Sequence, residues 1–447
     1  MFAIQKPAIF FEKLFGKQSI KENLSYRLLN YVVLVQHGNA NLLFNNLTKE
    51  LLLLSDAETE TVRKNSISFT DEAAKTLIEQ WFLVPLDFDD SKLRNQALEL
   101  TRLLQSKKYI TLYDIVTTTA CNARCFYCFE AGTKPYSMTE KTARDVIRCL
   151  KDYYNGKTIH INWFGGEPLC NTRVIDIISN GLAENNINFM STMTTNGSLF
   201  NRELAEHAVS KWKLKSVQIT LDGMEQTYNK VKAYKNMGEN PFQKVIGNIS
   251  CLLEVGISVM VRLNVDEYNI EETYQLVDFL AGKYSSYPNF SVYAHLLFED
   301  TGFIKTTKSQ QQRDDMAEKY LQLCEYIDNL GLRKRKPLEN KIATYFCLAD
   351  NPEGVLISAT GLMSRCENSV EGAATHPVTN ASKLPVWDKY CPSIDRCEKC
   401  AYYPSCLRLS DCPRCSRACE IYEQKLHLKD LNKQIIAAYE DYRNANK

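Results

Sequence analysis

The sequence predicts an α/β protein whose central part is a partial barrel of six β/α units, related to the eightfold TIM-type barrel. Three observations support this prediction. From residue 109 onward, β-rich runs alternate with helical stretches. Before them, residues 1–90 carry the hairpin and helix signals of a small winged-helix-like α+β module. After them, nine of the 16 cysteines fall between Cys347 and Cys419, which marks a separate cysteine-rich region.

Length, charge and hydropathy limit the classes of function. At 447 residues the chain is long enough for two or three domains. Its 54 Lys and Arg residues balance 53 Asp and Glu residues, so no overall charge favours nucleic acid or an anionic membrane. No apolar run reaches the length of a membrane span, and the N-terminus lacks the pattern of a secretory signal. We therefore expect a cytoplasmic protein, in which so many cysteines point to metal or redox chemistry.

The N-terminal module, residues 1–90, is predicted to be a hairpin, a third stretch of strand or helix, and a helix capped by Thr70 or Asp71. Its first three elements are Tyr26–Val35, Asn41–Asn45 and Glu50–Ser55. Winged-helix modules bind DNA, but this one has no basic recognition helix. We favour the other use of such a module, capture of an extended peptide along a strand edge. A charged linker helix over residues 91–108 follows.

The barrel is expected over residues 109–310. Its six predicted strands are Tyr109–Val116, Thr158–Phe164, Asn188–Thr194, Leu214–Leu221, Ser258–Val265 and Phe290–Leu297. The helix Pro241–Leu253 has clear ends, because Asn240 can cap it, Pro241 suits the first helical position and Gly256 follows it. Barrels of this kind place their chemistry on the loops that follow the strands.

Three cysteines with the spacing CxxxCxxC directly follow the first predicted strand: Cys121, Cys125 and Cys128. Thiolates are the usual ligands of iron–sulfur clusters, and four of them saturate a cubane. Three on one compact loop would leave one iron open to chelate a small molecule. The alternatives are a structural zinc knuckle and a disulfide loop, although zinc sites usually pair two short spacings around a longer gap.

Polar and glycine-rich motifs follow the next strands. In Gly165–Pro168, two glycines let backbone approach a ligand closely, and the carboxylate can hold an ammonium group. Thr195 and Asn196 end the third strand, Asp222 ends the fourth, and Arg262 lies in the fifth. Each motif alone is typical of an ordinary turn. Their joint order after a CxxxCxxC loop indicates one site at the carboxyl ends of the strands.

Together, the cysteine triplet and the Gly165–Pro168 motif resemble the radical S-adenosylmethionine (SAM) superfamily, over residues 109–300. The resemblance implies that the triplet holds a 4Fe–4S cluster whose open iron binds SAM. Reductive cleavage of SAM, with flavodoxin or ferredoxin as external electron donor, would give a 5′-deoxyadenosyl radical that abstracts a substrate hydrogen. The residues implied to contact SAM are Tyr127 at the adenine, Gly165, Gly166, Glu167 and Pro168 at the methionine amino group, and Thr195, Asn196 and Arg262 at the carboxylate or ribose.

The C-terminal cysteines resemble the SPASM domain, which in its family binds auxiliary 4Fe–4S clusters, and we assign it residues 311–447. The resemblance implies two auxiliary clusters, one held by Cys347, Cys366 and Cys412, the other by Cys397, Cys400, Cys406 and Cys415 or Cys419. Cys391 is a further candidate ligand. Five residues separate Cys406 from Cys412 where the family pattern has three. The alternative is a pair of zinc-ribbon-like knuckles.

SPASM enzymes of this superfamily mostly modify peptides or proteins. The segment Asn41–Thr48 resembles the precursor-recognition element of ribosomal peptide maturases. We therefore predict a maturase that installs an oxidative modification, preferably a thioether or other side-chain crosslink, in a precursor peptide whose leader binds residues 1–90. The alternatives are an anaerobic sulfatase-maturing enzyme that forms formylglycine, a peptide epimerase, and a non-enzymatic zinc-binding winged-helix regulator. After Asp222, many relatives carry a His and then an Arg, where this chain has Tyr228 and Lys232. No catalytic acid or base is assigned.

Overall fold

The chain folds into two compact units, which are described separately. Unit 1 comprises Met1–Ser106, Arg335–Phe346 and Lys389–Lys447, and unit 2 comprises Lys107–Lys334 and Cys347–Asp388. The computed structural model describes residues 1–64, 66–70, 72–105, 110–132, 134–235, 238, 240–297, 309–334, 336–342, 344, 347–367, 376–379, 395–406 and 421–446. Unit 1 thus joins the N-terminal module to the end of the chain. The predicted domain assignments stay predictions.

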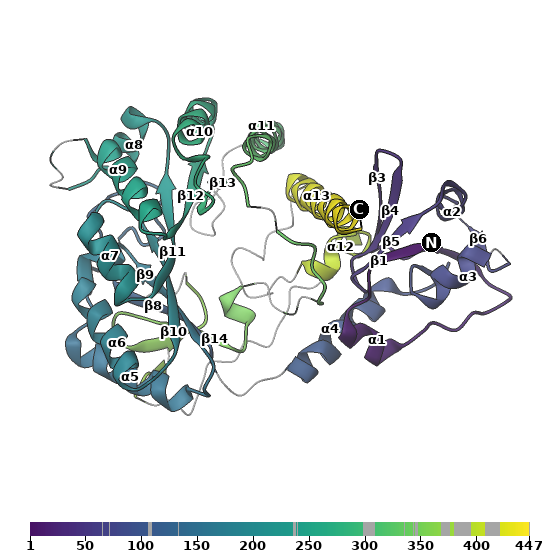
Figure 1. Ribbon diagram of the computed structural model, residues 1–447, viewed down its shortest axis with the longest axis horizontal. Helices are drawn as coiled ribbons and strands as arrows, with labels where there is room; N and C mark the ends of the chain where they lie inside the picture. Colours follow the sequence, from purple (N-terminus) through teal and green to yellow (C-terminus); the bar gives the residue numbers. More distant parts are fainter. Residues whose placement is uncertain are drawn as a thin grey trace. The chain divides into compact units, whose positions relative to one another are not determined.

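Unit 2 is built on a nine-stranded sheet of order β13-β12-β11-β10-β9-β8-β14-β15-β16 (Figure 1). Its parallel strands are β8 (Leu112–Thr118), β9 (Ile159–Gly165), β10 (Phe189–Thr195), β11 (Leu214–Leu221), β12 (Ser258–Val265), β13 (Phe290–Leu296) and β14 (Gly354–Ile357). The antiparallel strands β15 (Leu362–Ser364) and β16 (His376–Pro377) extend the edge beyond β14. All six predicted barrel strands are present within a few residues of their expected bounds. An α/β fold with a large parallel sheet is confirmed, while its closure as a partial barrel stays a prediction.

Helices connect the strands of unit 2 and line one side of the sheet (Figure 1). They are α5 (Glu140–Tyr153), α6 (Thr172–Glu184), α7 (Arg202–Ser210), α8 (Glu225–Lys232), α9 (Pro241–Glu254), α10 (Ile270–Tyr284) and α11 (Gln310–Asn329), with the short helices η1 (Pro168–Asn171) and η2 (Leu348–Asp350). As predicted, Asn240 caps α9 by accepting a hydrogen bond from the Gln243 backbone N–H. None of the helices that the structure describes is long and apolar enough to cross a membrane.

The two faces of the sheet in unit 2 differ in polarity. On β12, Val259, Val261 and Leu263 are buried, whereas Met260 is 41% exposed and Arg262 is half-buried. This alternation is typical of strands that pack helices on one face only. The apolar face forms the core under the helices, and the other face carries the polar side chains described below.

Unit 1 contains two small antiparallel sheets. The first has the order β1-β5-β4-β3 and the second β6-β2-β7. The strands are β1 (Phe2–Gln5), β2 (Ser25–Leu28), β3 (Val32–His37), β4 (Ala40–Asn45), β5 (Glu50–Leu54), β6 (Ile67–Ser68) and β7 (Leu83–Pro85). The helices are α1 (Ile9–Phe15), α2 (Asp56–Val62), α3 (Glu72–Glu79), α4 (Asp90–Gln105), α12 (Asp395–Glu398), η3 (Tyr403–Ser405) and α13 (Ile421–Ala445).

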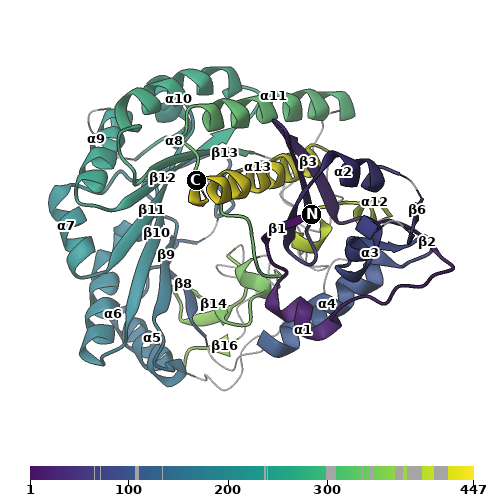
Figure 2. The ribbon, with the colours of Figure 1, turned by 45° about the vertical axis from the view of Figure 1, so that its right-hand side comes forward.

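Two details of unit 1 refine the expectations. The β-rich run Tyr26–Val35 forms two strands rather than one, because the Val32 N–H bonds to the Leu29 carbonyl and makes a turn between them. The ambiguous third stretch is the strand β5. Helix α13 packs on the first sheet beside β3 (Figures 1 and 2), where Leu431 and Ile435 join its buried apolar cluster. The end of the chain therefore completes the core of the N-terminal module.

Candidate active site

The cysteine triplet lies on the loop that follows β8. The Cys128 N–H bonds to the Cys125 carbonyl at 3.2 Å and the Ala131 N–H to the Cys128 carbonyl at 3.0 Å, which makes consecutive tight turns. Burial raises the pKa of the Cys121 thiol to about 12 and also raises the pKa of Cys128. Thiols in such surroundings lose their protons when they bind a metal cation, and thiolates are the ligands of iron–sulfur clusters. The donor set therefore fits a cluster.

A site for a single metal ion has a different geometry from a cluster site. Within the described ranges, no group of three His, Cys, Asp or Glu side chains lies close enough to hold a single ion. A zinc ion draws all its thiolates to about 2.3 Å from one atom, whereas each cysteine of a 4Fe–4S cluster binds a different iron. The triplet fits the cluster by residue type and by its place on one loop.

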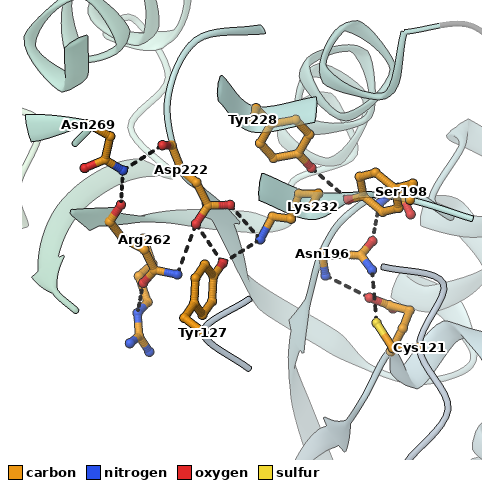
Figure 3. Close-up of polar contacts among 12 residues, drawn as sticks. Cys121, Tyr127, Asn196, Ser198, Asp222, Tyr228, Lys232, Arg262 and Asn269 are labelled. Atoms are coloured by element: carbon orange, nitrogen blue, oxygen red, sulfur yellow. Dashed lines mark hydrogen bonds and ion pairs between the residues drawn. The ribbon is translucent and has the colours of Figure 1, made fainter. Parts of the chain in front are cut away.

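Asparagine side chains from the residue after β10 and from the loop itself hold the first cysteine in place. The amide of Asn196 donates to Asn122 Oδ1 at 2.8 Å and lies 4.0 Å from the Cys121 sulfur (Figure 3). Asn122 in turn donates to the Ser198 hydroxyl at 2.9 Å. Asn196 was predicted to contact SAM, and that contact stays a prediction. Its observed role is to connect the end of β10 to the cysteine loop.

The two glycines at the end of β9, Gly165 and Gly166, allow a close approach of backbone to backbone. A Cβ atom on Gly165 would lie 2.1 Å from the Thr118 carbonyl oxygen, and one on Gly166 would lie 2.6 Å from that of Ala120. Gly165 also has a φ of +124°, which favours glycine. The glycines thus let the end of β9 press against the base of the cysteine loop. Their predicted approach to a ligand stays a prediction.

The Glu167 carboxylate is fully buried, and its hydrogen bonds join the segment after β9 to the end of β10. It accepts hydrogen bonds from the Thr195 hydroxyl at 2.8 Å, the Asn196 N–H at 2.8 Å and the Leu169 N–H at 3.1 Å. Burial raises its pKa. Pro168 follows at the start of η1, where its carbonyl accepts from the Thr117 hydroxyl at 3.1 Å. These contacts position Thr195 and Asn196, while the predicted contact of Glu167 with the methionine amino group stays a prediction.

Asp222, Lys232 and Tyr127 form a polar triad in which the first two residues are buried and Tyr127 is half-buried (Figure 3). The Tyr127 hydroxyl donates to Asp222 Oδ1 at 2.7 Å, and Lys232 Nζ lies 3.0 Å from Asp222 Oδ2 and 3.1 Å from the Tyr127 oxygen. Burial raises the pKa of Tyr127. Burial is the largest single influence on Lys232 and opposes its charge, but Asp222 together with Tyr127, Cys125 and Tyr228 outweighs it and raises the pKa of Lys232. The triad therefore holds an ion pair with a phenol as its third member.

The backbone around Lys232 also holds the cysteine loop. The Arg124 N–H donates to the Lys232 carbonyl at 2.7 Å, and the Lys235 N–H donates to the Asn122 carbonyl at 2.9 Å. The end of α8 is thus joined to the loop on both sides of Ala123, next to Cys121 and Cys125. Lys232 contributes through its backbone as well as through its side chain.

Arg262 belongs to the same polar network. Its Nε donates to Asn264 Oδ1 at 2.9 Å, and the Asn264 amide donates to Asp222 Oδ1 at 3.3 Å. Beside Arg262 on β13, the Tyr293 hydroxyl donates to Gln218 at 2.7 Å. The network therefore runs from the end of β11 across the polar face of the sheet. The predicted contact of Arg262 with SAM stays a prediction.

Sequence reasoning missed several of the residues that hold this site: Asn122, Ser198, Lys232, Asn264 and Asn269. The Asn269 amide donates to the carbonyls of Asp222 and Asn264, both at 2.8 Å (Figure 3). A usable signal was present, because amides and small hydroxyl side chains recur near the carboxyl ends of the predicted strands. From the sequence, Lys232 was noted only because many relatives carry an Arg where this chain has Lys232.

The C-terminal cysteines divide between the two units. Cys347 and Cys366 belong to unit 2, and Cys397, Cys400 and Cys406 belong to unit 1. No disulfide joins the cysteines of the described ranges. Cys391, Cys412, Cys415 and Cys419 lie outside the described residues, so the predicted ligand sets of the auxiliary clusters stay predictions.

The comparison with protein families identifies the central part of the chain. Residues 115–280 match the family model described as Radical SAM superfamily. The chain carries a radical SAM domain. This domain implies a 4Fe–4S cluster and SAM as cofactors. The matched segment contains β9 to β12, the cysteine triplet and the Asp222–Lys232 pair.

The chain is similar in sequence to several known proteins. It is 24% identical over 338 residues to the radical SAM cyclopropyl synthase TigE of Paramaledivibacter caminithermalis, covering 69% of this chain and 67% of TigE. It is 27% identical over 188 residues to the sporulation killing factor maturation protein SkfB of Bacillus subtilis, covering 42% and 43%. A GTP 3',8-cyclase of Clostridium perfringens is 28% identical over 167 residues, covering 37% and 50%. The chain thus spans about half or less of the last two proteins.

A solved structure has a similar fold. The structure of native anSMEcpe with bound AdoMet and Cp18Cys peptide matches 75% of this chain and 99% of its own, with a TM-score of 0.55 at 15% identity. At this identity the likeness concerns the fold alone. AdoMet is SAM, so a neighbour with this fold binds the cofactor that the radical SAM domain implies.

Proposed function

We propose that this radical SAM enzyme modifies a side chain of a ribosomally made precursor peptide, with a thioether or other side-chain crosslink as the favoured product. The observation that carries the proposal is the combination, in one chain, of a radical SAM domain with a small antiparallel sheet at the N-terminus. The names of two relatives support it, since SkfB is a maturation protein and TigE a cyclopropyl synthase.

The N-terminal sheet supports the peptide part of the proposal. In its order, β1-β5-β4-β3, the strand β3 stands at one edge. An edge strand presents backbone groups that can pair with an extended peptide, which is a common mode of peptide recognition. In this proposal the leader of the precursor adds to the sheet, and the core peptide reaches the polar face of the β8–β13 sheet.

The residues of the site have separate roles in this proposal. When bound at Cys121, Cys125 and Cys128, the cluster and SAM supply a 5′-deoxyadenosyl radical that abstracts a hydrogen atom from the peptide. Asn196 orients the loop beside Cys121, and the Asp222–Lys232 pair holds the loop from the side of α8. No proton transfer is assigned to the triad, which positions the loop.

The polar face of the sheet offers contacts for the substrate. Arg262, Tyr293 and Gln218 are half-buried there, and their hydrogen bonds fix their orientation. Fixed polar groups on a partly open face suit the amide groups of an extended peptide. An auxiliary cluster at the C-terminal cysteines, which is part of the proposal, would accept the second electron of the oxidation.

The test is anaerobic co-expression with short cysteine-containing peptides encoded beside the enzyme, followed by mass spectrometry of the peptides. Loss of two hydrogens that depends on Cys125, as judged with Cys125→Ala, supports an oxidative crosslink. Unchanged mass in ordinary water, with deuterium uptake in heavy water, would indicate an epimerase instead. Conversion of cysteine to formylglycine in a sulfatase peptide would indicate a sulfatase-maturing enzyme. No change of any kind by iron-loaded protein that cleaves SAM would overturn the peptide proposal.

A further inference from the structure

The segment Cys397–Cys406 belongs to the same compact unit as the N-terminal module. It winds through three successive turns: the N–H groups of Cys400, Tyr403 and Cys406 bond to the carbonyls of Cys397, Cys400 and Tyr403, at 3.0, 2.9 and 3.0 Å. In such a three-residue winding, side chains three positions apart lie on the same side. Three thiols that recur on one short segment are a donor set that suits an iron–sulfur cluster.

A buried lysine of the module contacts this segment. Lys49, in the turn between β4 and β5, is 1% exposed, and its ammonium donates to Asn46 Oδ1 at 2.7 Å and to the Ser405 hydroxyl at 2.9 Å. It also forms an ion pair with the Glu339 carboxylate at 3.3 Å. The Asn46 amide donates to the Ala401 carbonyl at 2.8 Å. Lys49 also has a φ of +66°, a conformation that is unfavourable for a residue other than glycine. A buried charge in such a backbone needs strong compensating contacts, and the segment supplies one of them.

An arginine of α4 contacts the other end of the segment. The Arg94 guanidinium lies 4.0 Å from the centre of the Tyr403 ring, and its Nη2 donates to the Cys406 carbonyl at 3.2 Å and the Tyr403 carbonyl at 3.4 Å. The Asn30 amide donates to the Glu398 carbonyl at 3.2 Å, next to Cys397. The module therefore holds the segment at its beginning, and α4 holds it at its end.

An apolar cluster joins the two parts as well. Tyr403 is buried among residues of the N-terminal module, and Cys397 and Cys400 pack against the same cluster, which also contains Leu29, Tyr31, Leu47, Val84, Leu93, Ala97 and Ile342. The apolar contacts thus join the same parts of the chain as the hydrogen bonds. The module and α4 together hold the segment at several positions between Cys397 and Cys406.

We propose that Lys49 and Arg94 are positioning residues for a metal centre at Cys397, Cys400 and Cys406, so that the N-terminal module forms the framework of this centre. The proposal rests on the proposed function, in which these cysteines hold an auxiliary cluster. An iron–sulfur cluster with thiolate ligands is anionic, and its reduction adds a further negative charge. The Arg94 guanidinium therefore favours the reduced state. Lys49, whose charge is paired with the Glu339 carboxylate, acts by fixing the backbone that carries the thiolates.

This inference changes how the peptide proposal can be tested. Deletion of residues 1–90 would remove Lys49 together with the surface on which Cys397–Cys406 is folded. Loss of activity in such a deletion would reflect a lost metal centre as readily as a lost leader site. Point variants that keep the module folded are required instead.

The experiment uses the full chain with Cys125→Ala and Cys347→Ala, so that the retained iron reports the centre at Cys397–Cys406. Arg94→Met and Lys49→Met are compared with Arg94→Lys and with the control Gln18→Met. Gln18 donates to the carbonyls of Ile78 and Leu83 inside the module, at 2.7 Å each. Iron and sulfide content and the midpoint potential from an EPR-monitored titration are measured. Hydrogen exchange of the β4 segment Ala40–Asn45 shows whether the module remains folded.

We expect Arg94→Met and Lys49→Met to lose iron severalfold and, where iron is retained, Arg94→Met to lower its midpoint potential. Arg94→Lys should restore part of either property, and Gln18→Met should change neither. A second measurement avoids the variants of the module: Cys400→Ser in the otherwise unchanged chain should reduce the exchange protection of Ala40–Asn45, because a metal that binds the folded state stabilises it. Since this variant keeps Lys49 and Arg94, it serves even if their variants fail to fold.

Three results would count against the inference. Iron that is unchanged in amount and potential in Arg94→Met and Lys49→Met, or unchanged protection in Cys400→Ser, overturns the inference alone. Absence of iron in the Cys125→Ala, Cys347→Ala background overturns the auxiliary centre and the inference together. Failure to modify any peptide, with iron that responds to Arg94→Met, overturns only the proposed function.

Discussion

The Lys232 ammonium lies 3.0 Å from the Asp222 carboxylate, and their side chains are only 3% and 1% exposed. This pair joins the end of β11 to the end of α8, whose last carbonyl holds Arg124 in the cysteine loop. A buried ion pair adds little stability relative to apolar residues, but the loss of one partner leaves an uncompensated charge. We conclude that the pair serves to position the loop.

Replacement of Lys232 tests this role. Lys232→Met should lower the free energy of unfolding by about 3–5 kcal/mol, because it leaves the Asp222 carboxylate buried without its cation. Lys232→Arg keeps the charge and should cost clearly less. Urea denaturation measures both, together with iron content after anaerobic purification. Equal stability of Lys232→Met and the unchanged chain would contradict the role assigned to the pair.

A second prediction concerns the close approach of β9 to the cysteine loop. Gly166→Ala would place a Cβ 2.6 Å from the Ala120 carbonyl oxygen, so the loop must shift, at a cost of about 1–3 kcal/mol, and should bind less iron. Gly247→Ala in α9 is the matched control, since its Cβ meets nothing within 4 Å. This control should keep its iron and gain about 1 kcal/mol. Full iron loading of Gly166→Ala would refute the packing argument.

The third prediction tests the contacts of Glu167. Thr195→Val removes a hydroxyl that lies 2.8 and 3.0 Å from the two carboxylate oxygens of Glu167. Since the carboxylate is fully buried, the loss should lower the free energy of unfolding by about 1–3 kcal/mol. Thr192→Val, three residues earlier on the exposed face of the same strand, should change it by no more than about 0.5 kcal/mol. Similar values for the two variants would argue against this role of Glu167.

The stability of the N-terminal module should depend on pH through Glu50. Burial, with a smaller contribution from Glu12, raises the pKa of Glu50 to about 7. Because this pKa is above that of the unfolded chain, the contribution of Glu50 is fully present below about pH 4.3 and is lost as the pH rises through 7.

The expected slope is at most about 1.4 kcal/mol per pH unit, and Glu50→Gln should abolish it. Urea unfolding is measured at several pH values between about 5 and 8. The unfolded fraction at each value is read from hydrogen-exchange labelling of Ala40–Asn45, and the labelling step itself is always at one fixed pH. If the free energy of unfolding of Glu50→Gln showed the same dependence on pH, the slope would arise from another group.

The sequence predicted the central sheet well because its signals are local. All six strands carry β-rich runs, and Asn240 and Pro241 mark the start of α9. The cysteine triplet, and the strand ends that follow, were identified because each lies directly after a strand. Short-range spacing and strand position therefore placed the candidate residues at the carboxyl ends of the strands.

Contacts between distant parts of the chain could not be predicted in this way. Nothing in the local pattern pairs Lys49 with Ser405, 356 residues later, or packs Leu431 of α13 on the sheet that contains Leu42. The predicted approach of Gly165 and Gly166 to a ligand stays a prediction, but their close approach to the carbonyls of Thr118, at the end of β8, and Ala120, just before Cys121, was not foreseen. Such roles depend on which segments meet in space, and a single sequence does not contain that information.

The central claim is that this radical SAM enzyme abstracts a hydrogen atom from a peptide. The most direct measurement is the isotope content of 5′-deoxyadenosine, formed anaerobically from SAM and a deuterated precursor peptide by the reduced, iron-loaded protein. The proposal predicts deuterium in the 5′-deoxyadenosine, and no 5′-deoxyadenosine with Cys125→Ala. Cleavage of SAM without any transfer of deuterium from a bound peptide would contradict the claim.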